Sequence, residues 1–567
     1  MIIEGAKVFN VYRKRFETKA VLLQEGLIRD ISDEVPLLNG EERIDARGRY
    51  LVPGLVDIHM HIESSMTVPC EFSRAVLPLG TTTVVSDPHE IANVFGVPGI
   101  RAFMDQDTDL DIFYGIPSSV PSTNPLLETT GGSISPEDAA LLAADARVLC
   151  LGEVMNAADL LSVEDTPTKR LIRRFREVQP RYPIEGHCPK ISGAELSAFI
   201  ASGVWSDHTH QNPASILEKI GKGMFIQLQR KSITAENIKT VVDEDLFEHV
   251  CLVTDDVMPD RLINGHLNSL VALAIKMGMK PEDAIYCATY VPARHMMLRD
   301  RGAIAPGRIA DFILLDDLES FSIESVYKAG RRVAGLEATR AKKRRQTFPP
   351  SFYTSIQRKP LCLEDFIVRA PEAYTEATIE CTCISLEPRS TFTKYCSVTC
   401  ALVDGLIDWK SAGLSLICAI ERYGNKAPLR FGFVESAFKK EGAVATTWAH
   451  DHHNLLVMGT SIQDMLYAAN MLIVQQGGYA VAQGGNIIAN APLKVGGIVD
   501  DGPIEDLARN IKTVRKAMRD LGYEHNDEIM SFSTLSLLVS PRLKISDKGL
   551  IDVKTQTLVE SYVLHST

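Results

Sequence analysis

Residues 50–61 decide the fold class of this chain, and they read Tyr50-Leu-Val-Pro-Gly-Leu-Val-Asp-Ile-His-Met-His61. An apolar run ends here in two histidines, His59 and His61. Side chains two residues apart on a strand point to the same face, so the two imidazoles can converge on one cation. The stretch therefore predicts a buried strand that carries metal ligands at its carboxyl end.

Short apolar runs of the same kind recur further along the chain. They lie at residues 82–86, 148–152, 182–186 and 250–254, and each is followed by polar residues and a helix-like segment. Strands that alternate with helices predict parallel βα units. About 250 residues of such units make a (β/α)₈ barrel, whose active sites form at the carboxyl ends of the strands. We therefore predict an α/β fold with a TIM-like (β/α)₈ barrel over residues 53–300.

The regions on both sides of the barrel also carry fold signals. Residues 1–52 and 301–338 read as short strands with turns, which predicts one small flanking β-sandwich domain built from both segments. The basic, proline-containing stretch 339–360 predicts a linker. Residues 361–567 are long enough for an additional C-terminal α/β domain. Several domains are expected, because a chain of 567 residues exceeds the size of one hydrophobic core.

Composition excludes several classes of protein. The chain is 45% hydrophobic and 23% charged, as globular proteins are. Sixty basic and 72 acidic residues give a net charge of −12, and phosphate contacts need clustered Lys and Arg, so we expect no nucleic-acid partner. The basic cluster at 340–345 is interpreted as solvated linker. No apolar run of about 18 residues and no signal-peptide pattern occurs, so we expect no membrane partner. Eleven scattered cysteines predict free thiols in a cytoplasmic protein.

Metal-ligand residue types recur where the later apolar runs end. Four imidazoles and two carboxylates are available in all, which suits two divalent ions about 3.5–4 Å apart with a bridging carboxylate. Glu153 is the natural bridge, because both its oxygens can bind. A one-ion site would leave Glu153 or His187 without a role. The predicted ligands are His59, His61, Glu153, His187, His208 and Asp255.

In this order, these residues resemble the ligand set of the amidohydrolase superfamily. More narrowly, the chain resembles the bacterial adenine deaminases over nearly its whole length. The stretches that carry this resemblance are 53–65, 77–93 with Asp87-Pro-His-Glu-Ile-Ala-Asn93, 186–189, 449–457 and 543–553. The resemblance implies two divalent ions, Mn²⁺ or Fe²⁺ with Zn²⁺ as the alternative, and hydrolysis of adenine, a small purine base, to hypoxanthine and ammonia. It also implies purine salvage, and we expect a homo-oligomer, with a homodimer as the first assumption.

The chemistry of that reaction assigns roles to residues of this chain. Two cations lower the pKa of a bridging water, so hydroxide is available at neutral pH. Asp255 would take the hydroxide proton and return it to the departing nitrogen, whereas Asp256 is expected to point to the other side. A protonated carboxyl group would stabilise the ring nitrogen beside the reacting carbon, and both Glu63 and Glu90 could supply it. Substrate contacts are expected from Glu63, Ser64, His89 and Glu90.

Three positions depart from the family pattern. Thr209-His210 follows His208 where these deaminases carry Glu, Gln229-Arg-Lys-Ser232 replaces Arg-Glu-Gly-Ser, and His452 replaces Ser. The changes leave two other enzyme hypotheses open. One is deamination of a different purine-like heterocycle, and the other is hydrolysis of a cyclic amide, as in dihydroorotases and hydantoinases. A non-catalytic metal-binding protein is the alternative from another class.

Further candidate groups have two interpretations each. His210 is a substitute ligand or a surface residue, and His89 with Glu90 points into the pocket or caps a helix beside it. Residues 450–453 read His-Asp-His-His; they form a second metal cluster or, as we favour, a structural element of the C-terminal domain. Four cysteines bind zinc or are core thiols, and their spacing is not the usual one for zinc. They are Cys381, Cys383, Cys396 and Cys400.

Overall fold

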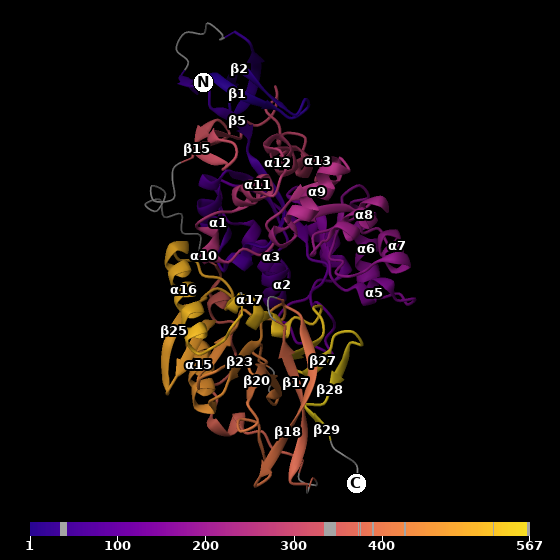
Figure 1. Cartoon of the computed structure of the whole chain (residues 1–567), viewed down its shortest axis with the longest axis vertical. Coiled ribbons are helices and arrows are strands. Elements are labelled where there is room, and N and C mark those ends of the chain that lie inside the picture. The colour runs from indigo at the N-terminus through magenta and orange to yellow at the C-terminus, as the bar shows by residue number, and fades with distance from the viewer. Residues whose placement is uncertain are drawn as a thin grey trace.

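The computed structural model describes residues 1–34, 42–333, 348–371, 374, 376–387, 390–424, 427–525 and 527–563. Three β assemblies follow one another along the long axis of the molecule (Figure 1). A small sheet lies at one end, the barrel lies in the middle and the C-terminal domain lies at the other end. The basic cluster at 340–345 lies outside the described residues.

The barrel consists of eight parallel strands within the described range 42–333. Two sheets, β6–β10 and β11–β13, follow chain order. A backbone bridge between Met60 and Asp255 joins the last strand to the first, and the Trp205 N–H donates to the Ile184 carbonyl at the other seam. The predicted barrel is therefore confirmed. Its strands are β6 (Leu55–Met60), β7 (Thr81–Ser86), β8 (Asp111–Ile116), β9 (Val148–Val154), β10 (Ile184–Gly186), β11 (Ser206–Asp207), β12 (Phe225–Leu228) and β13 (Val250–Leu252).

Helices cover the strands, and residues on both faces of the strands are buried. Several helices begin with proline, a residue that suits the first helical position because the missing N–H needs no partner there. Thr166 caps one of them by accepting the N–H of Lys169. The helices are α1 (Pro69–Val76), α2 (His89–Phe95), α3 (Val97–Met104), α4 (Pro136–Leu142), α5 (Ala157–Leu161), α6 (Pro167–Val178), α7 (Gly193–Ala201), α8 (Pro213–Gly221), α9 (Ala235–Asp243), α10 (Pro259–Leu262), α11 (Leu267–Lys276), α12 (Pro281–Ala288) and α13 (Tyr290–His295).

The small sheet takes strands from both flanks of the barrel. Its order is β16-β15-β14-β5-β1-β2-β3, with β4 paired to β1. β5 pairs with β1 and with β14, where Pro53 lies opposite Phe312. The barrel is thus inserted between two parts of one sheet. The strands are β1 (Ile2–Asn10), β2 (Arg15–Gln24), β3 (Leu27–Ser32), β4 (Arg43–Asp45), β5 (Tyr50–Pro53), β14 (Phe312–Asp317), β15 (Ser322–Lys328) and β16 (Arg331–Arg332).

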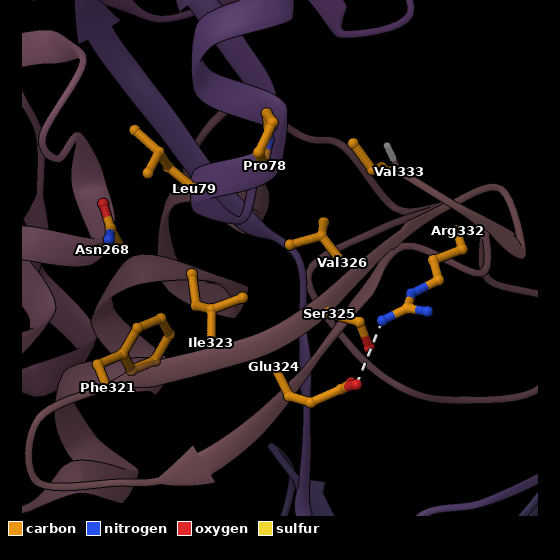
Figure 2. Close-up of a pocket in the computed structure, with 10 residues that line it drawn as sticks. All are labelled: Pro78, Leu79, Asn268, Phe321, Ile323, Glu324, Ser325, Val326, Arg332 and Val333. Carbon is orange, nitrogen blue, oxygen red and sulfur yellow. Dashed lines mark hydrogen bonds and ion pairs between the residues drawn. The ribbon is translucent and has the colours of Figure 1, made fainter. Parts of the chain in front are cut away.

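A cavity of about 570 Å³ lies between this sheet and the barrel (Figure 2). Pro78 and Leu79 of the 3₁₀ turn η2 (Leu77–Leu79) line one side, and residues of β15 line the other. Arg332 forms an ion pair with Glu324 at its rim, with 3.2 Å between nitrogen and oxygen. None of the predicted metal ligands lines this cavity, so it belongs to the small domain and not to the predicted centre.

The C-terminal domain is built on a ten-stranded sheet in the order β19-β18-β17-β21-β20-β23-β22-β24-β25, with β29 paired to β17. A smaller sheet, β26-β27-β28, and three helices pack on it. The elements are β17 (Thr378–Leu386), β18 (Thr393–Val403), β19 (Leu406–Asp408), β20 (Leu414–Ile420), β21 (Arg430–Glu435), β22 (Ala443–Thr446), β23 (Leu455–Gly459), β24 (Gly478–Gln483), β25 (Asn486–Pro492), β26 (Leu543–Ser546), β27 (Gly549–Asp552), β28 (Thr557–Val559), β29 (Tyr562–Val563), α15 (Ile462–Gln475), α16 (Ile504–Asp520) and α17 (Glu528–Ser533).

One apolar core runs from the barrel into the C-terminal domain. It contains Phe72 of the barrel and Trp448 of the C-terminal domain, both fully buried. In the described part of the predicted linker, 348–360, Phe348 and Phe352 are buried too, and the Phe352 ring stacks on Phe95 with centroids 3.9 Å apart. Among the described residues, no helix combines the length and the apolar character that crossing a membrane requires.

Candidate metal centre

Three histidines at the strand ends are oriented as metal ligands. The Nδ1–H of His61 donates to the Asp87 carbonyl over 2.9 Å, and that of His208 donates to the Gly186 carbonyl over 3.1 Å. With the protons held there, Nε2 of each ring is the free, ligating nitrogen. Nε2 of His59 is buried and has no hydrogen-bond partner within the described part of the chain. These are the features that imidazole ligands of a cation need.

Glu153 lies between two groups of imidazoles. Its Oε1 is 3.3 Å from His61 Nε2, whereas its Oε2 is 2.9 Å from His187 Nδ1 and 3.3 Å from His208 Nε2. Each oxygen thus faces a different group, as a carboxylate that bridges two ions must. His59, His61 and Glu153 form one set of three ligand atoms within 4.8 Å of one another, and Glu153, His187 and His208 form a second.

Asp255 completes the group of six predicted ligands. Its Oδ1 lies 3.5 Å from His61 Nε2 and 3.7 Å from His59 Nε2. The structure therefore brings all six predicted ligands together at the carboxyl ends of the barrel strands. Four imidazoles and two carboxylates around one bridging group are a donor set that fits a pair of divalent cations.

The electrostatics of the centre follow from burial and from the neighbouring rings. Burial alone would raise the pKa of Glu153, but His208 and His187 outweigh it and hold that pKa well below the usual range. Burial also opposes ionisation of Asp255, and the nearby imidazoles, His61 first, still lower the pKa of Asp255. Burial and the nearby His208 keep the pKa of His59 well below its ordinary value. Carboxylates that stay ionised and an imidazole that stays neutral are suited to bind metal.

Asp87 supports the centre, and sequence reasoning gave it no role. Its Oδ2 accepts the backbone N–H of Glu153 over 2.8 Å, and its Oδ1 lies 3.6 Å from His89 Nδ1. Gly152 makes this contact possible, since a Cβ there would lie 2.1 Å from Asp87 Oδ2. The signal that could have identified Asp87 is its position directly after the strand 81–86, the same position that marked the predicted ligands.

The backbone at Asp255 explains one wrong prediction. Its φ of 57° is left-handed, so side chains no longer alternate as they do along a strand. As a result, the carboxylates of Asp255 and Asp256 both lie within 4.8 Å of a His61 ring nitrogen. Ser64 Oγ donates a hydrogen bond to Asp256 Oδ1. Asp256 therefore faces the centre and not the opposite side.

Glu63 and Glu90 lie in contrasting environments. Glu63 Oε1 accepts the Ile91 N–H over 3.1 Å, and its Oε2 is buried without a partner among the described residues. Burial raises the pKa of Glu63 to about 7. Burial also disfavours ionised Glu90, but His450 and His453 outweigh that effect and hold the pKa of Glu90 well below the usual range.

His89 points into the centre, in agreement with one of its two interpretations. Its Nδ1 lies 3.8 Å from Glu153 Oε1, and its ring centroid is 4.6 Å from that of His61. Its Nε2 faces Glu90 Oε1 at 3.8 Å. His89 is therefore within reach of a small molecule bound beside Glu153.

The C-terminal domain reaches this centre through residues 448–453, which we call the covering segment. Trp448 Nε1–H donates to the Glu63 carbonyl over 3.2 Å, and His450 Nδ1 lies 2.6 Å from Glu90 Oε1. His453 Nε2 contacts the other oxygen of Glu90. The favoured interpretation of residues 450–453 as an element of their own domain missed these contacts, because no local pattern indicates which domains meet.

The positions that depart from the family pattern are partly exposed and partly buried, with Thr209, Gln229 and His452 on the buried side. His210, Arg230 and Lys231 are exposed. Gln229 is buried, and its side-chain amide donates to the His208 carbonyl over 3.1 Å. The positive charges of Arg230 and Lys231, at positions where this chain departs from the family pattern, therefore lie away from the ligands.

The cysteines of the C-terminal domain carry no bridge. Cys383 lies directly opposite Cys396 on the neighbouring strand, and the Cys396 thiol donates to the Cys383 carbonyl at 3.5 Å. All eleven cysteines of the chain are free thiols in the structure.

Comparison with known proteins agrees with this geometry. The model of the amidohydrolase family matches residues 50–179 and 184–333, and that of the adenine deaminase C-terminal domain matches 390–557. The barrel and its centre are those of an amidohydrolase. A curated adenine deaminase from Clostridium perfringens strain 13 is 48% identical over 99% of this chain and 98% of the relative. That from Lactobacillus delbrueckii subsp. bulgaricus is 46% identical, with 98% of each covered. The chain belongs to the adenine deaminase family.

More distant matches were found as well. The adenine deaminase of Kosmotoga olearia is 33% identical over 99% of this chain and 96% of the relative. Among solved structures, an enamidase matches with a TM-score of 0.46 at 16% identity, covering 59% of this chain and 95% of that one. A beta-aspartyl dipeptidase from Fervidobacterium islandicum AW-1 matches with a TM-score of 0.45 at 20% identity, covering 59% and 96%.

Proposed function

We propose that the protein hydrolyses adenine to hypoxanthine and ammonia with two divalent metal ions, Mn²⁺ or Fe²⁺, with Zn²⁺ as the alternative. The observation that carries the proposal is the convergence of six ligands, with Glu153 between the imidazoles, in a chain of the adenine deaminase family. A cytoplasmic location, a role in purine salvage, a homo-oligomeric state, and the absence of nucleic-acid and membrane partners belong to the same proposal.

Each ligand then has a defined task. His59 and His61 would hold one ion, His187 and His208 the other, and Glu153 would contact both. The ions would supply Lewis acidity, which makes a bound water acidic enough to deprotonate near neutral pH. Asp255 accepts a proton from the attacking water at its carboxylate and returns it to the departing amino nitrogen. Its lowered pKa keeps it ionised at neutral pH, so it can accept that proton.

Glu63 is our choice for the proton donor to the ring nitrogen beside the reacting carbon. Its Oε2 is buried without a partner among the described residues, so it can offer a hydrogen bond to a ligand. Both oxygens of Glu90, in contrast, lie against imidazoles. We propose that Glu90 fixes those two rings in place and that Glu63 contacts the substrate.

Ammonia release from adenine by purified full-length protein supplied with Mn²⁺ is the test. Formation of hypoxanthine is followed in parallel, and metal-stripped protein is the control. We expect turnover of adenine that depends on metal, and none of dihydroorotate or hydantoin. Turnover of a cyclic amide without turnover of adenine would favour the second hypothesis, and metal-loaded protein that leaves adenine intact would contradict the proposal.

A further inference from the structure

The covering segment is held rigidly against the barrel. The Trp448 side chain is fully buried, and its Nε1–H donates to the Glu63 carbonyl over 3.2 Å. His450 and His453 both contact the carboxylate of Glu90. Asn454, directly after the segment, donates through its side chain to the Thr129 carbonyl of a barrel loop over 2.9 Å. The position of the segment over the metal centre is therefore fixed by both sides of the domain interface.

His450 and Asp451 of this segment each have one buried polar atom without a hydrogen-bond partner among the described residues. His450 engages Glu90 Oε1 at 2.6 Å and Asp451 Oδ1 at 3.2 Å, both through its Nδ1. His450 Nε2 and Asp451 Oδ2 are buried and have no partner among the described residues. A buried polar atom without a hydrogen bond costs about 1–3 kcal/mol, so two such atoms on consecutive residues call for a ligand that satisfies them.

The side chains of His450 and Asp451 lie near the other substrate-facing groups. Asp451 Oδ1 is 4.0 Å from His89 Nε2, and His89 in turn lies 3.8 Å from Glu153 Oε1. The Trp448 ring packs edge-on against His450, with centroids 4.4 Å apart. A ligand that reaches His450 and Asp451 therefore occupies the same region as the metal centre and is not a second, independent ligand.

The chemistry of the pair selects the ligand. Burial opposes a charge on His450, but Glu90 and Asp451 outweigh it and raise the pKa of His450 well above its usual value. Its Nε2 therefore carries a proton and donates, whereas Asp451 Oδ2 accepts. A donor and an acceptor on consecutive residues complement a ring that offers one unprotonated nitrogen and one N–H. The five-membered ring of a free purine base has that pair, and a sugar on the ring nitrogen removes the N–H.

We infer that His450 and Asp451 bind the imidazole edge of the substrate base, so that the C-terminal domain forms part of the substrate site and selects free bases over nucleosides. The inference rests on the proposed function, since it takes the substrate to be a purine. It gives the C-terminal domain a direct role in recognition.

The test compares adenine with 9-methyladenine, which lacks the N–H, in wild type, Asp451→Ala and the conservative Asp451→Asn. Loss of a hydrogen bond to a charged group weakens binding by about 1.5–3 kcal/mol, which is about 10- to 100-fold. We expect KM for adenine to rise by that factor in Asp451→Ala and by less in Asp451→Asn. We also expect the preference for adenine over 9-methyladenine to fall at least about tenfold in Asp451→Ala, with metal content and thermal midpoint unchanged.

His452→Asn is the matched control. His452 lies in the same segment, and its Nδ1 accepts the Asn454 N–H, a role that an asparagine oxygen can take over. KM should stay at the wild-type value in this variant. An unchanged KM and an unchanged preference in a folded Asp451→Ala protein would overturn the inference alone. If wild type fails to turn over adenine, the proposed function falls. Calorimetric binding of the two bases to the same variants still decides the inference, because it needs no turnover.

Discussion

At the scale of single residues, one left-handed backbone position organises the acidic side of the centre. Asp255 has a φ of 57°, a conformation that aspartate and asparagine adopt more readily than most residues. It is also bridged through its backbone to Met60 of the first barrel strand. The replacement Asp255→Asn therefore preserves the backbone and removes the carboxylate, which makes it a clean test of a proton-transfer role.

We expect Asp255→Asn to retain most of its bound metal and to lose turnover of adenine by at least about 10²-fold, the usual contribution of a general acid–base group. Asp256→Asn is the comparison. Asp256 accepts the Ser64 hydroxyl and lies near His61, so its loss should raise KM and reduce turnover less. Steady-state kinetics on both folded, metal-loaded variants measure this. Near-normal turnover in Asp255→Asn would place the proton shuttle on another residue.

Glu153 gives a prediction about metal content. Its two oxygens face different imidazole groups, and a neutral amide bridges two cations poorly because only its oxygen is a ligand. Glu153→Gln should therefore lose one of the two ions per chain preferentially. Elemental analysis of wild type and variant, prepared in parallel, gives the count. Two ions retained in the variant, or at most one in fully active wild type, would contradict the bridging role.

At the scale of elements, a contact between the carboxyl ends of β7 and β9, the two strands on either side of β8, sets the position of the bridge. Gly152 on β9 has no side chain, and this absence lets the Asp87 carboxylate, which follows β7, accept the Glu153 N–H. We expect Gly152→Ala to displace Asp87 and to lower metal occupancy and activity together. Gly221→Ala, in open space at the end of α8, should be neutral. Metal analysis and thermal midpoints of both variants make the comparison, and unchanged occupancy in Gly152→Ala would show that Asp87 is dispensable.

Five of the eight barrel strands, β6, β7, β9, β10 and β13, were predictable from sequence because each coincides with an apolar run. A buried parallel strand is a continuous apolar run, and the ligands His59, Glu153 and Asp255 follow such runs at the same end. The orientation of Asp256 was not predictable, because alternation along a strand assumes regular backbone angles. The contacts of His450 with Glu90 were not predictable either, since 360 residues separate them and only domain packing brings them together.

At the scale of the whole molecule, one buried lysine should make stability depend on pH. Lys544 on β26 is fully buried and donates to the Thr391 carbonyl over 2.7 Å. Burial lowers the pKa of Lys544 to about 7. Between about pH 7 and its ordinary value near 10.4, the unfolded chain binds a proton that the folded protein does not. Its contribution to the free energy of unfolding therefore rises with pH over this range.

The replacement Lys544→Met retains an apolar side chain and removes the amino group, so the variant has no charge to lose at this position. We expect the variant to have a higher free energy of unfolding than wild type, with the largest difference at pH 7. This difference should shrink by up to about 1.4 kcal/mol per pH unit towards pH 9. Denaturant midpoints of both proteins at pH 7, 8 and 9 test it. Lys554→Met, at an exposed position, is the control and should show a difference that does not vary with pH. A difference in free energy of unfolding between Lys544→Met and wild type that stays constant from pH 7 to 9 would mean that this lysine stays charged in the folded protein.

The insertion of the barrel into the small sheet has a consequence for synthesis on the ribosome. β5 ends at Pro53, but its antiparallel partner β14 begins at Phe312. During translation, the amino-terminal strands leave the exit tunnel with one edge unpaired until the whole barrel has been made. An unpaired strand edge is a template for joining another chain. Nascent chains on neighbouring ribosomes are therefore exposed to mispairing while residues 54–311 are synthesised, and a chaperone that shields β1–β5 would act in that interval.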